Sequence, residues 1–202
     1  MSLSRLFVIL VFFVSAFLLA AACTQPAGTT TTKLPAPAPS SPASSGSPRV
    51  LLETTAGNIT IALDPDMPVT AGNFASLVKK GFYNGVIFHR VISGFMIQGG
   101  DPTGTGSGGP GYTIMDEFTN PPHKNERGAV AMANAGPNTG GSQFFINLVD
   151  NSVRPGFDSS YPVFGNVVDG MEVVDTIAQG KTSGPPNDRP LQPVTIVRAE
   201  MV

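Results

Sequence analysis

Residues 88–101 read FHRVISGFMIQGGD and place one cation, Arg90, among apolar residues. An unpaired charge in such surroundings is costly, so Arg90 needs either a nearby carboxylate or a ligand. Phe95 and Met96 open a short apolar run, and both residue types are as common in a core as at a binding surface. The stretch therefore predicts a strand over 95–98 beside a cation whose role the residues alone leave open.

Residues 131–147 read AMANAGPNTGGSQFFIN, a run of small residues followed by an apolar one. Small side chains allow another backbone to approach closely, so an extended peptide could pair with main-chain groups around Asn134. The alternative is a tight Gly/Asn/Pro loop that joins two strands.

Short apolar runs and turn signals alternate through the rest of residues 49–202 and predict an all-β barrel or sandwich with two helices. A hairpin is expected from the runs 50–54 and 59–63 on either side of 55–58. Helices are expected over 70–80, ended by Gly81, and over 169–179, with Asp169 as N-cap and Gly180 as its stop. The remaining strands are expected at 86–88, 129–133, 143–148, 162–167 and 194–201.

Both quoted stretches together resemble the cyclophilin-type peptidyl-prolyl isomerases. The first matches the family pattern F-H-R-x-x-x-x-F-M-x-Q-G-G-D, and the second matches M-A-N-A-G-x-N-T-x-G-S-Q-F-F-I. The resemblance extends over roughly the whole of 49–202 and includes the strand 161–165 and the helix start 170–175. It implies a mainly β fold: a closed eight-stranded antiparallel barrel capped by two helices.

The resemblance also implies roles for individual residues. It makes Arg90 the catalytic cation, acting with Gln98 and Phe95. The residues that it implies for substrate binding are Met96, Ala133, Asn134, Gln143, Phe145, Phe157 and Tyr161. Gln98, Gln143 and the backbone of Ala133 and Asn134 are implied to hold the peptide.

The segment 153–158 departs from the family pattern. Many members have a Trp before the strand at 161–165, whereas this chain has no Trp, and we take Phe157 as the residue in that position. Tyr161 stands where many members have His. Since Phe157 cannot donate a hydrogen bond, we expect ciclosporin-type inhibitors to bind more weakly than to members with Trp.

The activity implied by the resemblance is cis–trans isomerisation of X–Pro bonds in proline-containing polypeptides, which needs no nucleophile, metal or cofactor. A non-catalytic proline-peptide binding module or holdase chaperone is the alternative, because segment 153–158 is altered. A structural lipoprotein, with neither groove nor activity, is a third reading.

Composition excludes several other classes. A formal net charge of −2 argues against a broad nucleic-acid surface. One cysteine, Cys23, excludes an intramolecular disulfide framework, and two histidines make a dedicated transition-metal site unexpected. We expect a monomer.

The first 48 residues are expected to lie outside the fold. Residues 1–22 are typical of an export signal, since Arg5 precedes 17 uncharged residues and the end resembles a bacterial lipobox at Cys23. An uncleaved anchor, or cleavage that leaves Cys23 a free thiol, is the alternative. Residues 23–48, rich in Thr, Pro, Ser and Ala, predict a disordered linker. The domain 49–202 is therefore expected to be exported and lipid-anchored on the outer side of the cell membrane.

Several further side chains carry expectations of their own. His89 is expected to be a structural hydrogen-bonding residue and His123 to lie in an exposed loop. The acidic pairs Asp116-Glu117 and Asp64/Asp66 are expected to be solvated. The run 104–109 is expected to be a mobile surface loop rather than a phosphate loop, because no Lys-Ser/Thr follows it.

Overall fold

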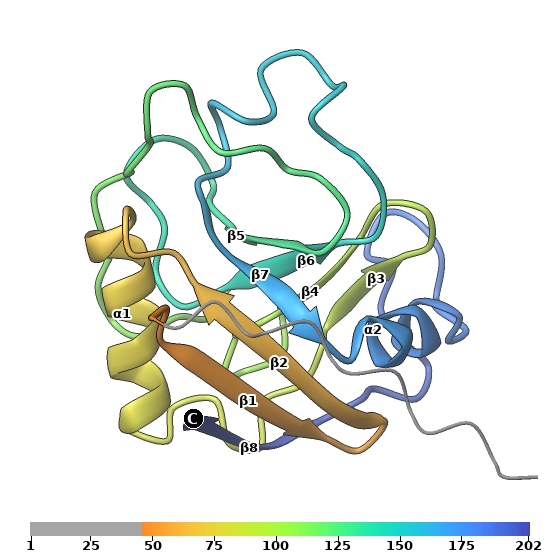
Figure 1. Cartoon of the computed structure of the whole chain (residues 1–202). Coiled ribbons are helices and arrows are strands. Elements are labelled where there is room, and N and C mark those ends of the chain that lie inside the picture. The colour runs from red at the N-terminus through yellow and green to blue at the C-terminus, as the bar shows by residue number, and fades with distance from the viewer. Residues whose placement is uncertain (1–45) are drawn as a thin grey trace, which may run out of the picture. The chain divides into compact units, whose positions relative to one another are not determined.

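The computed structural model describes residues 46–202, which form an antiparallel sheet of eight strands and two helices (Figure 1). In chain order the elements are β1 (Arg49–Thr54), β2 (Gly57–Leu63), α1 (Pro68–Lys79), β3 (Arg90–Ile92), β4 (Met96–Gly99), β5 (Ala129–Met132), β6 (Phe144–Asn147), β7 (Val163–Asp169), α2 (Met171–Ala178) and β8 (Ile196–Met201). The predicted hairpin is confirmed as β1 and β2, joined through the two residues 55–56.

The strands of the curled sheet follow the order β3-β4-β6-β5-β7-β2-β1-β8. The predicted mainly β antiparallel fold with two helices is therefore confirmed. The prediction of a closed barrel is wrong, because β3 and β8 end the sheet and do not pair with each other as strands.

The segment between the two edge strands shows why the sheet is not closed. It also shows why the predicted strand at 86–88 is wrong. Residues 86–88 form no strand and meet the segment before β8 through one isolated bridge, Ile87 to Thr195. The pairing ends on one side at Gly85, which leaves the extended conformation at φ +81°, and beyond Phe88 the chain pairs elsewhere, since the N–H of Val91 donates to the carbonyl oxygen of Asp188. A few backbone hydrogen bonds, such as that from the N–H of Phe88 to the carbonyl oxygen of Val194, join the two segments, but strand pairing does not close the sheet.

Helix α1 begins two residues earlier than predicted, because Pro68 fits the first helical turn. Gly81 follows its last turn at φ +69°, as expected for a helix terminator. Asp169 does not cap α2. It ends β7 opposite Thr60, and Gly170 takes the N-cap at φ +84°. A Cβ on Gly170 would lie 2.1 Å from a backbone oxygen of Asn58, so a capping side chain has no room there.

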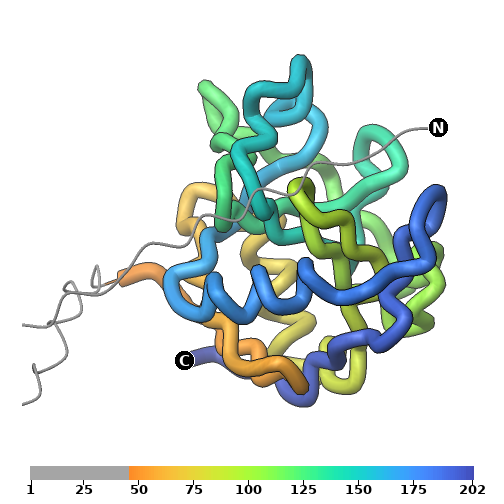
Figure 2. The backbone as a smooth tube through the Cα atoms, turned by 90° about the vertical axis from the view of Figure 1, so that its right-hand side faces the viewer, coloured from red at the N-terminus to blue at the C-terminus, as the bar shows by residue number. Residues whose placement is uncertain are grey.

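The sheet carries apolar side chains on both faces. Alternate residues of β4 and β6, such as Ile97 and Phe144, join the main core together with both helices. Their neighbours Met96 and Phe145 join a second, smaller cluster. Figures 1 and 2 show the later part of the connection 100–128 and the connection 148–162 extending from the same end of the sheet. The two faces therefore divide the molecule into a structural core and a surface that these connections surround.

The predicted signal 1–22, Cys23 and all but the last three residues of the linker 23–48 lie outside the described residues. Within residues 46–202 no helix is long and apolar enough to span a membrane.

Candidate active site

Strand register lines up side chains that lie far apart in the sequence. Arg90 on β3 is opposite Gln98 on β4, and Gln98 is opposite Phe145 on β6. Phe145 is in turn opposite Ala131 on β5. Directly paired residues of antiparallel strands point to the same face, so these four side chains form one row across the sheet.

The second apolar cluster lies on the same face as this row, and we call it the outer-face cluster. Its buried members are Met96, Ala129, Ala131, Phe145 and Val163, and its partly buried members are Ile92, Phe95, Ala133, Phe157 and Tyr161. The aromatic rings pack edge-on or tilted, with centroids 5.5 Å apart for Phe145 and Tyr161 and 4.7 Å apart for Phe157 and Tyr161. The structure thus brings together the predicted apolar site residues, including Phe157.

Arg90 borders this cluster with 39% of its side chain exposed. Its Nε lies 3.9 Å from Oδ2 of Asp188, which is too long for a hydrogen bond. Among residues 46–202 this is its only salt-bridge contact, and its guanidinium makes no hydrogen bond there. The guanidinium N–H groups are therefore available to a ligand.

Two glutamine amides connect the row to the loop that follows β4. Nε2 of Gln98 donates to Oε1 of Gln143 over 2.9 Å. Nε2 of Gln143 donates to the carbonyl oxygens of Gly106 and Gly108 over 3.0 and 2.8 Å. The loop therefore fixes the orientation of both amides.

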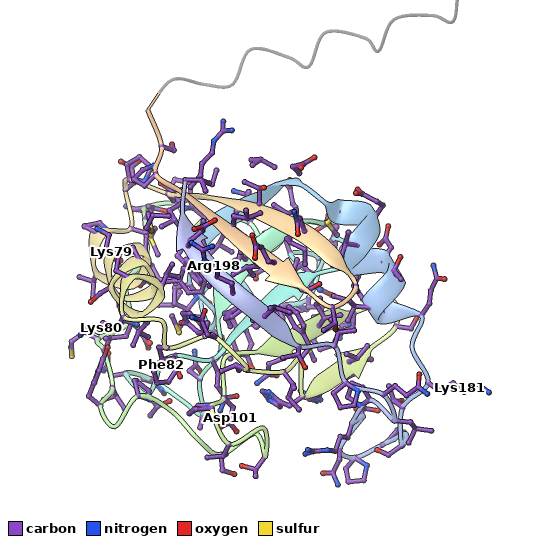
Figure 3. All side chains as sticks on the ribbon, turned by 90° about the horizontal axis from the view of Figure 1, so that it is seen from below. Lys79, Lys80, Phe82, Asp101, Lys181 and Arg198 are labelled. Carbon is purple, nitrogen blue, oxygen red and sulfur yellow. The ribbon has the colours of Figure 1, made fainter. Side chains whose placement is uncertain are left out.

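The buried carboxylate of Asp101 organises that loop (Figure 3). It accepts hydrogen bonds from the backbone N–H groups of Thr103, Thr105, Gly106 and Gly108, and from the hydroxyls of Thr103 and Thr105. Burial alone would raise the pKa of Asp101, but hydrogen bonds from Gly108, Thr103 and Gly106 hold that pKa well below its usual value. Sequence reasoning missed this role, although an Asp before a Thr/Gly-rich run is typical of such a turn.

A cleft of about 660 Å³ lies beside the row. Four predicted site residues line it, Gln98, Ala133, Asn134 and Gln143, together with the loop 106–113. The predicted residues therefore divide between the cleft and the outer-face cluster, and Ala133 belongs to both.

Main-chain groups at the cleft differ in their availability. The N–H of Ala133 donates to the carbonyl oxygen of Gln143 over 3.0 Å, so it is not free for a peptide. The main-chain N–H and C=O of Asn134 make no hydrogen bond within residues 46–202. Its side chain donates to the carbonyl oxygen of Ser160. Within residues 46–202, Asn134 thus offers both of its main-chain groups and Ala133 offers its carbonyl oxygen.

Other polar side chains depart from expectation. His89 is buried, and neither ring nitrogen has a hydrogen-bond partner within residues 46–202, so the predicted hydrogen-bonding role is wrong. Burial lowers the pKa of His89, opposed by Asp101 and reinforced by Arg189 and Arg90.

Two loop predictions also fail, because residues distant in sequence meet there. His123 is partly buried, with Nδ1 3.0 Å from Oδ2 of Asp64, although Nδ1 makes no hydrogen bond within residues 46–202. Glu117 is not merely solvated: its carboxylate accepts the backbone N–H groups of Val69 and Thr70 at the start of α1. Residues 46–202 contain no cluster of three His, Cys, Asp or Glu side chains placed to bind a metal.

A curled antiparallel sheet that presents an aromatic cluster, an available guanidinium and a peptide-sized cleft on one face fits an enzyme acting on polypeptide chains. Residues 49–201 match the family described as cyclophilin type peptidyl-prolyl cis-trans isomerase/CLD. The chain belongs to this family, and its activity is peptidyl-prolyl cis–trans isomerisation.

Similar proteins support this assignment. A peptidyl-prolyl cis-trans isomerase of Helicobacter pylori is 48% identical over 132 residues, which cover 64% of this chain and 79% of that protein. The peptidyl-prolyl cis-trans isomerase-like 1 of Aspergillus oryzae is 43% identical over 157 residues, covering 76% and 94%. The crystal structure of a cyclophilin type isomerase of Cryptosporidium parvum superposes with a TM-score of 0.71 at 34% identity, covering 78% of this chain and 98% of that one.

Proposed function

We propose that Arg90 and the outer-face cluster catalyse the isomerisation, and that the enzyme assists the folding of proteins outside the cytoplasm. The observation that carries the catalytic part is the row made by Arg90, Gln98 and Phe145, because it sets an available cation beside an apolar surface. The substrates are X–Pro bonds in polypeptides.

The mechanism follows from the physics of the amide bond. Rotation about C–N has a barrier of roughly 18–20 kcal/mol, because twisting breaks the resonance of the planar amide. In the twisted state the nitrogen becomes pyramidal and gains a lone pair, which the planar amide lacks. A donor aimed at that nitrogen therefore binds the transition state selectively.

Arg90 supplies the donor in this proposal, since its guanidinium is always protonated and carries several N–H groups. One charge-assisted hydrogen bond contributes about 1.5–3 kcal/mol, equivalent to roughly 10- to 150-fold in rate. The outer-face cluster receives the proline ring through Phe95, Met96, Phe145, Phe157 and Tyr161. The twisted amide is less polar than the planar one, so apolar surroundings favour it further.

The polar residues hold the rest of the peptide. The amides of Gln98 and Gln143 are oriented for peptide carbonyl and N–H groups, and the free main-chain groups of Asn134 allow strand-like pairing. Ciclosporin-type inhibitors are expected to bind weakly at this surface, because the chain has no Trp to donate a hydrogen bond.

Export and lipid anchoring rest on the amino-terminal sequence. The apolar run before Cys23 is typical of a signal with a lipobox-like end, and the Pro/Thr-rich stretch up to residue 48 would serve as a spacer. Uncatalysed X–Pro isomerisation takes tens to hundreds of seconds, which is slow enough to limit folding. An anchored isomerase would then act on chains folding near the membrane.

The test compares catalysis with binding alone. Residues 49–202 are mixed with a short X–Pro peptide, and cis–trans exchange is followed by NMR spectroscopy together with the refolding rate of a proline-limited exported protein. We expect both to accelerate. Peptide binding at the uncatalysed exchange rate would instead support a non-catalytic binding module or holdase, which the altered segment 153–158 would then explain.

A further inference from the structure

A second arginine, Arg154, lies against the outer-face cluster in the connection between β6 and β7. Its guanidinium carbon is 4.5 Å from the centroid of the Phe95 ring, in a cation–π arrangement. The residue is exposed, and it makes no salt bridge within residues 46–202. Arg154 therefore presents a positive charge at the rim of the surface that receives the proline.

A buried amide holds Arg154 and Phe95 together. Nε of Arg154 donates to Oδ1 of Asn151 over 3.1 Å, while Nδ2 of Asn151 donates to the carbonyl oxygen of Phe95 over 3.1 Å. Nδ2 of Asn151 also donates to Oδ1 of Asn147, over 2.8 Å. Asn151 and Asn147 are both fully buried.

The amide series continues into the sheet. Nδ2 of Asn147 donates to Oδ1 of Asn125 and to the carbonyl oxygen of Ala129. Asn125 in turn binds the other end of the connection 148–162. Its backbone N–H and its Nδ2 donate to Oδ1 of Asp158, and Nδ2 also donates to the carbonyl oxygen of Tyr161. A guanidinium anchored in this way loses less conformational freedom on meeting a ligand than a free side chain would.

The acidic side chains of this connection are engaged elsewhere. Asp150 accepts hydrogen bonds from the backbone and hydroxyl of Ser152. Asp158 is bonded to Asn125 and lies 3.7 Å from Nζ of Lys124. A free carboxylate could therefore approach Arg154 without displacing an existing ion pair.

The position of Arg154 indicates which part of a bound peptide it would contact. Phe95 precedes β4, whereas the cleft begins with Gln98 near the opposite end of β4 and continues into the loop after it. A chain whose proline occupies the outer-face cluster thus has one flank at the cleft and the other beside Arg154.

We propose that Arg154 makes this isomerase select substrates with a glutamate or aspartate next to the proline, on the flank that lies over Phe95. The inference rests on the proposed function of the outer-face cluster. A carboxylate there gains a charge-assisted hydrogen bond to a guanidinium that is already oriented.

The experiment measures kcat/KM of the full chain on matched peptides that carry Glu, Gln or Lys on one side of the proline or on the other. We expect Glu to exceed Gln by about two- to fivefold on one side only, with Lys poorest there. The preference for Glu is expected to shrink as NaCl rises from about 0.05 to 0.5 M, since salt screens an exposed pair.

Three variants test whether Arg154 causes the preference for Glu peptides. Arg154→Gln is expected to equalise Glu and Gln peptides, and Arg154→Lys to keep part of the difference because it keeps the charge. Lys80→Gln, which removes the same charge at the exposed end of α1 (Figure 3), is expected to leave the preference intact. A preference for Glu that survives in Arg154→Gln would overturn the inference.

The wild-type measurements alone can overturn the role of Arg154 or the proposed function. Catalysis of Glu and Gln peptides at equal rates on both sides would overturn the role of Arg154 and leave the proposed function standing. Failure to accelerate exchange in any peptide would overturn the proposed function, and this inference with it.

Discussion

Asp101 stays ionised although it is fully buried, because six donors surround its two oxygens. Its loop holds Gln143, and Gln143 orients Gln98. A carboxylate that does not itself line the cleft thus determines how the polar half of the site is arranged.

Replacing Asp101 by Asn is expected to destabilise the fold by about 1.5–3 kcal/mol at pH 7, because an amide nitrogen would face N–H donors. The folded pKa of Asp101 lies far below its usual value of 3.8. As pH falls below about 4, Asp101 becomes protonated in the unfolded chain before it does in the folded one, so the wild type loses its greater free energy of unfolding.

Urea unfolding of both proteins from pH 7 to pH 3 measures the difference. We expect the difference in free energy of unfolding between the two proteins to be constant above pH 5 and to decrease toward pH 3. Equal stability of wild type and Asp101→Asn at pH 7 would show that the carboxylate does not organise the loop.

Individual residues differ in how far the sequence could predict them. Arg90, Phe95 and Phe145 lie in long motifs, and the structure places them together as expected. No role was predicted for Arg154, and Glu117 was wrongly expected to be solvated, because their partners are fixed by tertiary contacts: Glu117 accepts from Thr70, which lies 47 positions earlier. No local pattern encodes such a contact.

At the scale of elements, the loop after β4 has two neighbouring glycines with different surroundings. A Cβ on Gly108 would lie 2.0 Å from Oδ1 of Asp101, whereas one on Gly109 would meet nothing within 4 Å. Gly108→Ala is expected to cost about 1–3 kcal/mol and to lower kcat/KM by displacing the carbonyl that holds Gln143.

Gly109→Ala is the matched control, with an expected change within about 0.5 kcal/mol. Thermal unfolding and peptide exchange are measured for both variants. If Gly108→Ala behaves like Gly109→Ala in both assays, the close packing of the loop around Asp101 has no part in the site.

The sequence predicts where several strands lie but not how they pair. Apolar runs located β4, β5 and β6 to within about a residue or two, since alternation and turn signals are local. They could not predict pairing order, and so could not distinguish an open curled sheet from a closed one. The segment 86–88 is apolar like the others, but the chain leaves the extended conformation at Gly85, and the segment forms one bridge only.

At the scale of the whole molecule, the proposed catalytic domain and its proposed anchor are separable. Every predicted catalytic and substrate-binding residue lies within 49–202, whereas the predicted lipidation site is Cys23. One acyl chain binds a membrane only marginally, while two or more anchor a protein stably. Cys23→Ser is therefore expected to release the protein from the membrane fraction or to leave it unprocessed.

Fractionation of cells that express the wild type or Cys23→Ser, with the mass of the mature amino-terminal peptide, tests this expectation. A soluble wild type with an unmodified Cys23 thiol would refute lipidation. Peptide isomerisation by residues 49–202 is expected to be the same under either outcome.

The turnover of Arg90→Lys tests the central claim most directly, because lysine keeps the charge but lacks the planar fork of donors. Exchange kinetics give kcat and KM on one X–Pro peptide. We predict that kcat falls at least about tenfold, equivalent to roughly 1.4 kcal/mol, with KM nearly unchanged, since the bond forms chiefly in the twisted state. An unchanged kcat with a raised KM would make Arg90 a ground-state anchor and contradict the mechanism.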